Sequence, residues 1–121
     1  MTGFAGLAWR WAGYEGVYGS GMALPDGDSK LAHQLVENQG ALLLDVRTPA
    51  EYAEHHLPNS VLIPHDEVGR RIAEVLEAQQ GDKAKPIVVF CRRGGRAQTA
   101  KDTLIQHGFT EVTNLGGIDA W

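Results

Sequence analysis

Short apolar segments alternate with amphipathic segments from about residue 23 to the end of the chain, and this alternation constrains the fold more than any other feature. The apolar runs are only a few residues long and are bounded by Gly, Pro or polar residues, as expected of strands that are buried on both faces. The most strand-like run is Pro86-Ile-Val-Val-Phe90. We expect five strands, at residues 22–24, 41–44, 60–63, 86–90 and 111–114.

The segments between these runs carry apolar residues at helical spacing. We expect helices that begin at Asp26 or Asp28, at Thr48, at Asp66 and within about five residues after Cys91, with a short last one at 118–121. Thr48 and Glu51 form a capping-box pattern with Pro49 in the first turn. The order βαβαβαβαβ predicts an α/β fold, with a central parallel five-stranded sheet and helices on both faces.

The first 22 residues differ in composition from the rest. Residues 1–27 hold seven of the 15 glycines, and five of the nine aromatic residues lie in the same stretch. Glycine at this density opposes a stable helix. We therefore divide the chain into an N-terminal arm, 1–22, and one domain, 23–121. The arm is either an idle leader or a segment whose aromatic side chains pack on the domain or on a partner, and we favour the second reading.

Charge and cysteine content exclude several classes of protein. Eleven basic and 15 acidic residues give a net charge of −4, which argues against general nucleic-acid binding. A single cysteine excludes an intrachain disulfide and the usual structural zinc site, and we expect no metal or organic cofactor. No apolar run approaches the length of a membrane span. We expect a cytoplasmic protein, or a periplasmic one if a signal peptide has been removed.

The segment Cys91-Arg92-Arg93-Gly94-Gly95-Arg96-Ala97 is the most informative part of the sequence. In parallel α/β sheets, ligands bind beyond the carboxyl ends of the strands. A short loop with Gly before a helix turns backbone N–H groups toward one point, and the positive end of the helix adds to this anion site. This field favours the Cys91 thiolate, which makes the thiol nucleophilic.

A buried structural cysteine is the alternative for Cys91, since free cysteines are often buried. The adjacent Gly94-Gly95 pair and three arginines favour a functional thiol, because a cysteine that only fills space in the core needs neither glycines nor arginines beside it. Arg92, Arg93, Arg96 and Lys101 are expected to form a positive patch around it. The five histidines lack metal-ligand spacing, and surface or capping roles are expected for them.

Several motifs occur together in the order and spacing of a known family. They are Leu44-Asp45-Val46-Arg47-Thr48-Pro49-x-Glu51-Tyr52, His56-Leu57-Pro58-Asn59-Ser60, the Cys91–Ala97 loop, Gly108-Phe109, and Leu115-Gly116-Gly117 with Trp121. By these motifs, residues 23–121 resemble a single rhodanese (sulfurtransferase) domain, which implies a three-layer fold. The chain departs from the pattern at His55, where a glycine is usual, and at Ala97, where Ser or Thr is common. Its end at Trp121 also precedes the family's usual short tail.

The resemblance implies ping-pong sulfur transfer through a persulfide on Cys91. The donor would be thiosulfate or a similar small anion, and the acceptor a thiol, cyanide or a protein. Arg92 and Arg93 would guide the donor, Gly94, Gly95 and the loop amides would stabilise the persulfide, and Arg96 would shape the loop and hold the anion. Asp45 and Arg47 would brace the strand ends through ion pairs.

Loop length separates this reading from related phosphatases, which use Cys-x5-Arg. Here four residues separate Cys91 from Arg96, which suits a sulfur atom better than a phosphate. Two further alternatives remain: a non-catalytic or redox-sensing module that keeps a reactive cysteine, and one module of a longer chain.

Overall fold

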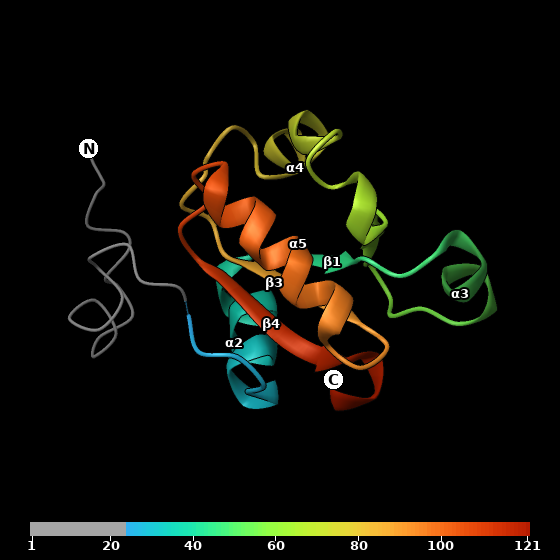
Figure 1. Ribbon diagram of the computed structural model, residues 1–121. Helices are drawn as coiled ribbons and strands as arrows, with labels where there is room; N and C mark the ends of the chain where they lie inside the picture. The colour runs from blue at the N-terminus through green and yellow to red at the C-terminus, as the bar shows by residue number, and fades with distance from the viewer. Residues whose placement is uncertain (1–23) are drawn as a thin grey trace.

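The structure, a computed structural model, describes residues 24–121, and its centre is a parallel sheet in the strand order β2-β1-β3-β4 (Figure 1). The strands are β1 Leu42–Asp45, β2 Val61–Leu62, β3 Ile87–Cys91 and β4 Val112–Gly117. All three strand pairings are parallel, so the predicted α/β architecture is confirmed. The arm expected over residues 1–22 lies outside the described residues.

The helices are α2 Ser29–Gln39, α3 Pro49–Glu54, α4 Ile72–Ala78 and α5 Gly95–Gln106, with short 3-10 turns η2 His65–Glu67 and η3 Ile118–Ala120. The side chain of Asp28 caps α2, and Gly40 ends that helix in the left-handed conformation. The capping box predicted for Thr48 and Glu51 is present at the start of α3. None of the helices within residues 24–121 is long and apolar enough to cross a membrane.

The prediction of five strands was wrong for the part of the chain that the structure describes, where the sheet has four. Met22 and Ala23, which belonged to the expected first strand, lie outside the described residues. Leu24 is buried but not in a strand. Its neighbour Pro25 has no N–H to offer a strand ladder, and the Pro25 carbonyl instead accepts a hydrogen bond from the hydroxyl of Thr113 at 2.7 Å.

The helix predicted from Asp66 onward is divided into two parts. η2 ends at Glu67 and α4 begins at Ile72, with turns between them. Gly69 lies in this interval, and glycine has a low helix propensity. Val68 and Val75 are nevertheless both fully buried. The apolar spacing thus correctly indicated which residues are in the core, although they do not lie on one continuous helix.

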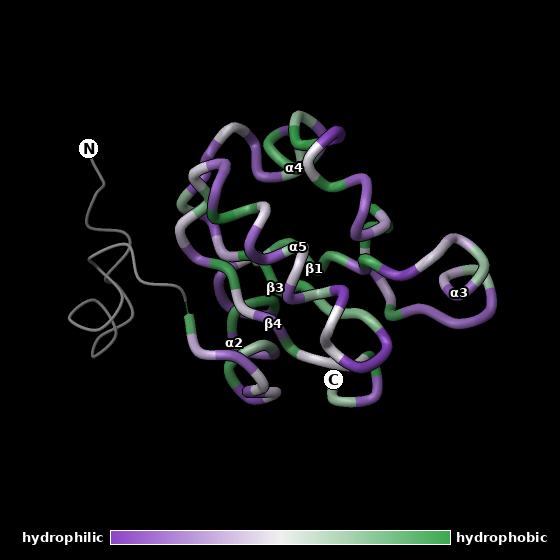
Figure 2. The backbone as a smooth tube through the Cα atoms, viewed as in Figure 1, coloured by the Kyte–Doolittle hydropathy of each residue, from purple (hydrophilic) through white to green (hydrophobic). Residues whose placement is uncertain are grey.

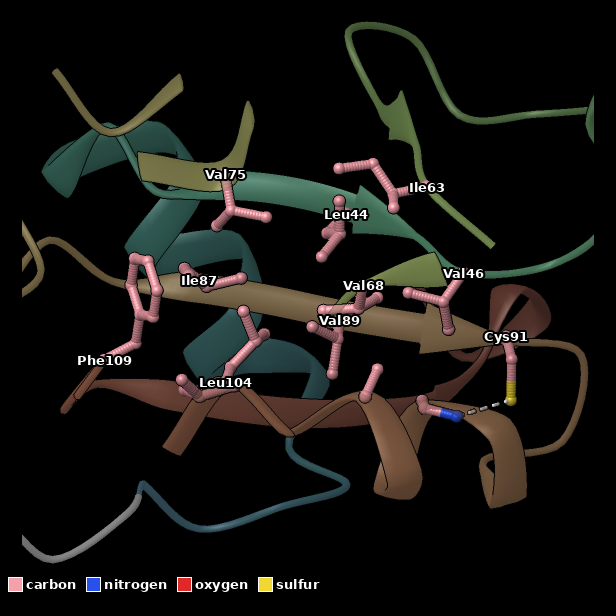
Figure 3. Packing of buried hydrophobic residues seen from close by; sticks show 13 residues of the cluster. Leu44, Val46, Ile63, Val68, Val75, Ile87, Val89, Cys91, Leu104 and Phe109 are labelled. Atoms are coloured by element: carbon pink, nitrogen blue, oxygen red, sulfur yellow. Dashed lines mark hydrogen bonds between the residues drawn. The ribbon is translucent and has the colours of Figure 1, made fainter. Parts of the chain in front are cut away.

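Side chains from β3 alternate between two hydrophobic clusters, one on each face of the sheet. Ile87, Val89 and Cys91 pack on the side of α4 and α5 (Figure 3). Val88 and Phe90 pack on the side of α2. Figure 2 shows hydrophobic stretches along the central strands and hydrophilic ones on the surrounding loops. Both faces of the sheet are covered by helices, so we look for a functional site at the edge where β3 ends at Cys91.

Candidate active site

Cys91 is the last residue of β3, and its sulfur lies beyond the strand, facing the start of α5 (Figure 3). Sγ accepts hydrogen bonds from the backbone N–H of Gly94 at 2.8 Å and from that of Ala97 at 3.4 Å. Cys91 is 1% exposed, so the sulfur is held within the loop instead of projecting into solvent. Two backbone donors thus converge on one sulfur, which is the geometry that an anion site requires.

Glycines of β4 make room for this loop. Gly94 has φ of 110°, and a Cβ on it would lie 3.3 Å from the Gly116 Cα. At Gly117, a Cβ would overlap the backbone carbonyl of Arg92. The loop therefore passes directly over the end of β4, at a separation that only glycine permits. The sequence analysis treated Leu115-Gly116-Gly117 as a motif and missed this packing role.

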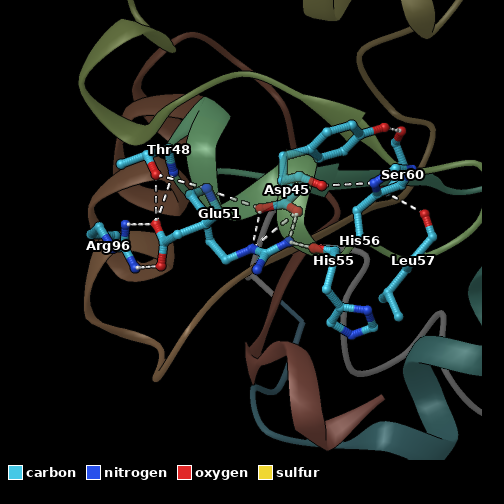
Figure 4. A network of polar contacts seen from close by, with 10 residues as sticks. Asp45, Thr48, Glu51, His55, His56, Leu57, Ser60 and Arg96 are labelled. Carbon is cyan, nitrogen blue, oxygen red and sulfur yellow. Dashed lines mark hydrogen bonds and ion pairs between the residues drawn. The ribbon is translucent and has the colours of Figure 1, made fainter.

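The three arginines of the loop differ in their surroundings. Arg92 and Arg93 are exposed, and neither has an ion-pair partner among residues 24–121. Arg96 donates to both carboxylate oxygens of Glu51, at 2.7 and 3.1 Å (Figure 4). The hydrogen bonds to Glu51 raise the pKa of Arg96. Hydrogen bonds from Arg96 and then from the Thr48 backbone lower the pKa of Glu51 to about 2.

The pairing of Glu51 with Arg96 is not evident from the sequence, where Glu51 has only its capping pattern with Thr48. The two residues are 45 positions apart, and no local pattern connects them. Their bidentate ion pair joins α3 to the first turn of α5, and it occupies part of the Arg96 guanidinium that was expected to hold the anion.

Asp45 and Arg47 form a buried pair at the end of β1, with Nη2 of Arg47 at 2.7 Å from Oδ2 of Asp45. The Nε of Arg47 donates to the same carboxylate, and the hydrogen bonds to Asp45 raise the pKa of Arg47. Nη2 also donates to the backbone carbonyl of His55 at 2.6 Å. The pair thus ties the end of β1 to the segment after α3.

Lys101 is not part of the positive patch, contrary to the expectation from sequence. It is 5% exposed, and its Nζ donates to the carbonyl of Leu24 and to Asp26 Oδ1, at 3.1 and 2.5 Å. The spacing Ala97, Ala100, Lys101, Leu104 follows the buried face of α5, and that periodicity was the signal that could have shown it.

Asn114 on β4 is a second residue that the sequence analysis missed. Its Nδ2 donates to the carbonyl of Gly94 at 3.1 Å, so it contacts the loop that holds the sulfur.

Among residues 24–121 there is no group of three or more His, Cys, Asp or Glu side chains that could hold a metal ion. Two histidines have structural contacts: His33 stacks on Trp121 and His56 stacks on Tyr52. The site therefore consists of a thiol, converging amides and nearby cations.

Comparisons with known proteins show which family the chain is similar to. The family model described as Rhodanese-like domain matches residues 28–121. The protein named Sulfurtransferase from Allochromatium vinosum is 36% identical over 92 residues, which cover 75% of this chain and 80% of that protein. Thiosulfate sulfurtransferase GlpE from Pseudomonas syringae is 35% identical over 89 residues, covering 73% and 78%. The solved structure of a rhodanese with anions from E. coli is 33% identical, with a TM-score of 0.60, and the match covers 67% of this chain and 91% of that one.

Proposed function

The chain belongs to the rhodanese-like domain family, and on that premise we propose that it is a sulfurtransferase that moves sulfane sulfur from thiosulfate or a similar anion to a thiophilic acceptor. The observation that carries the proposal is the position of the Cys91 sulfur, which accepts hydrogen bonds from two loop amides at the carboxyl edge of the sheet. We propose Cys91 as the nucleophile and its persulfide as the intermediate.

The reaction divides into two displacements at sulfur. The Cys91 thiolate attacks the outer sulfur of thiosulfate, a new S–S bond forms, and the bond to the sulfonate sulfur breaks. Sulfite leaves with the electron pair, and Cys91 carries a persulfide anion. An acceptor such as cyanide or a thiolate then attacks the outer sulfur of the persulfide, takes it away and restores the thiolate.

The loop would stabilise the negative charge in each of these states. The N–H groups of Gly94 and Ala97 already point at Sγ, and the N-terminal end of the 12-residue helix α5 adds its positive dipole end. Preorganised donors of this kind lower the energy of charge that develops during a reaction. Gly94, with its φ of 110° and its close approach to Gly116, allows the turn that leads into α5.

We assign donor recognition to Arg92 and Arg93, because both are exposed beside the nucleophile and lack an ion-pair partner within residues 24–121. Guanidinium groups bind oxyanions in bidentate fashion. Arg96 would act mainly through the shape of the loop, since Glu51 holds its guanidinium. Asp45 and Arg47 would support the site by fixing the end of β1.

Mass spectrometry of the intact protein after thiosulfate treatment tests the proposal. The expected result is a gain of about 32 Da, one sulfur atom, located on Cys91. The gain should be absent in Cys91→Ser and should disappear from the wild type when cyanide is added, with release of thiocyanate. A folded wild type that gains no mass and produces no thiocyanate would contradict the thiosulfate reaction. Oxidation of Cys91 by peroxide without any sulfur uptake would favour redox sensing instead.

The same assay tests donor recognition. Replacing both Arg92 and Arg93 with Ala should slow sulfur uptake at low thiosulfate concentration while the thermal unfolding temperature stays close to that of the wild type. This follows because exposed charges rarely contribute more than about 0.5 kcal/mol to stability. Unchanged kinetics in the double variant would remove both residues from the site.

A further inference from the structure

Asn114 lies on the face of β4 that packs against α5. Val112, two residues earlier on the strand, belongs to the hydrophobic cluster that includes Ala100 and Leu104 of α5. Side chains of a strand alternate between faces, so Asn114 lies on the same side as Val112. Its amide therefore meets the first turn of α5, where Nδ2 donates to the carbonyl of Gly94 at 3.1 Å.

The Asn114 side chain has one orientation because each of its polar atoms has a partner. Nδ2 also donates to Oε1 of Gln98 at 3.3 Å, and Oδ1 accepts from the N–H of Gly116 at 2.9 Å. The backbone N–H of Asn114 donates to Oδ1 of Asp26 at 2.8 Å. Asn114 is 8% exposed, and a buried amide with these bonds cannot rotate without leaving a donor or acceptor unpaired.

Gly94 needs an external anchor more than any other residue of the loop. Glycine has no Cβ to restrict its backbone angles, yet the N–H of Gly94 must stay directed at the Cys91 sulfur, 2.8 Å away. The carbonyl of the same residue accepts from two donors, Nδ2 of Asn114 and the backbone N–H of Gln98 at 2.9 Å. The carbonyl belongs to the peptide plane that follows Gly94, and the N–H belongs to the plane that precedes it. Holding the carbonyl fixes one of these two planes and so limits the backbone rotations that would turn the N–H away from the sulfur.

We propose that Asn114 is a positioning residue for sulfur chemistry at Cys91: it holds the Gly94 carbonyl so that the Gly94 N–H remains aimed at the thiolate and the persulfide. The catalytic consequence rests on the proposed function. The effect on the thiol itself does not, because the same hydrogen bond acts on any reaction of the Cys91 sulfur. Asn114 has no direct contact with Sγ, so its influence passes through one backbone residue.

Asn114→Asp is the sharpest variant. It preserves the shape of the side chain and the acceptor for the Gly116 N–H, but it replaces the donor to Gly94 with an oxygen and adds a negative charge. Three quantities are measured: kcat and KM with thiosulfate, the rate of Cys91 alkylation by iodoacetamide, and the amide NMR signal of Gly94. We expect kcat to fall about tenfold, less than the loss of a whole oxyanion donor. KM should change less than twofold, alkylation should slow severalfold, and the Gly94 signal should shift.

Gln98→Ala is the matched control. It removes the other partner of the Asn114 amide, an exposed side chain, and leaves the bond to Gly94 in place. It should stay within twofold of the wild type in kcat and in alkylation. Asn114→Ser removes the amide without adding a charge, so it must show the same changes if they come from the lost donor to Gly94. It also carries the test if Asn114→Asp does not fold, and circular dichroism checks the folding of both variants.

The outcomes separate the two proposals. A folded Asn114 variant with the wild-type alkylation rate and an unshifted Gly94 signal would overturn the positioning role. So would an equal loss of kcat in Gln98→Ala. If the wild type takes no sulfur from thiosulfate but the Asn114 variant still slows alkylation and shifts the Gly94 signal, the positioning role stands and the proposed donor fails.

Discussion

Gly117 has no space for a side chain, because its Cβ would overlap with the carbonyl oxygen of Arg92. This contact is between two backbones, so neither side can move aside by changing a rotamer. The neighbouring Gly116 also lies close to the loop, because a Cβ on Gly94 would be 3.3 Å from its Cα. At the scale of residues, the shape of the Cys91 loop therefore depends on glycines that lie in a different element of the fold, at the end of β4.

Gly117→Ala should displace the loop and leave the core in place. The added methyl group must push Arg92 away, which moves the amides that follow it relative to the Cys91 sulfur. We expect at least a tenfold loss of sulfur transfer, since small misplacements in an active site have large effects. Gly69→Ala is the control, because its Cβ would meet only the Thr103 methyl group at 3.5 Å. Equal activity in the two variants would show that the loop tolerates the displacement.

From the sequence alone, a candidate site can be predicted among residues that are neighbours along the chain. Cys91 and its loop follow from a strand, a Gly pair and a helix in succession, and the structure places them as that pattern predicts. Glu51 and Asn114 could not be found in this way. Glu51 already had a local role as a cap, and Asn114 depends on the pairing of β3 with β4, where Val89 lies opposite Asn114. The contact of Glu51 depends on how α3 lies against α5, and that of Asn114 depends on the register between β3 and β4. A single sequence specifies neither.

Among the α-helices of residues 24–121, α3 differs from the others because none of its residues is buried. It projects from the rest of the domain (Figure 1), and polar contacts hold it there. These contacts are the Glu51–Arg96 ion pair, the bond from Arg47 to the carbonyl of His55 just after α3, and the bond from the Tyr52 hydroxyl to the carbonyl of Ser60 at 2.8 Å (Figure 4). The position of α3 relative to the active-site loop is thus set by hydrogen bonds and charge instead of by apolar packing.

Glu51→Gln separates the two functions of this residue. Glutamine preserves the capping box, since its carbonyl oxygen still accepts from the Thr48 N–H, but the ion pair with Arg96 is lost. We expect the free energy of unfolding at pH 7 to fall by about 1 kcal/mol, as for a partly exposed bidentate pair. Urea unfolding measures it, and Glu54→Gln, an exposed carboxylate on the same helix, should change it less.

The pH dependence of this difference has a definite sign. Hydrogen bonds from Arg96 and then from Thr48 lower the pKa of Glu51 in the folded protein to about 2, below its usual value of 4.5. Such a group stabilises the fold fully above pH 4.5 and loses that contribution as the pH falls toward 2. The difference between wild type and Glu51→Gln should therefore be constant from pH 7 to about 5.5 and shrink by pH 3. A difference that grows on acidification would contradict the assignment.

At the level of elements, periodicity predicted most of the architecture. The four helices and four strands of residues 24–121 all lie near their expected positions. The exceptions have local causes: Pro25 next to Leu24 and Gly69 between η2 and α4. The prediction that Lys101 belongs to the positive patch was wrong for another reason. Its charge suggested an exposed position, but its helical spacing places it on the buried face of α5.

Across the described molecule, both ends are fastened to the same core. At one end, Leu24 is buried in the cluster on the α2 side, and Asp26 accepts from Lys101 and from the backbone N–H of Asn114. At the other end, Trp121 stacks on His33, whose Nε2 lies 2.6 Å from the Trp121 carbonyl. These contacts join residues that are 75 to 88 positions apart, so residues 24–121 should unfold as one cooperative unit.

Lys101→Met tests this cooperativity. The change keeps an unbranched side chain on the buried face of α5 but leaves the carbonyl of Leu24 without its donor, which costs about 1–3 kcal/mol when the group stays buried. The denaturant dependence of unfolding should stay that of a single transition, with its midpoint lowered. Lys30→Met, at an exposed lysine on α2, should stay within about 0.5 kcal/mol of the wild type. If Lys101→Met loses no more stability than Lys30→Met, or unfolds in two steps, then the segment at Leu24 is not part of the cooperative core.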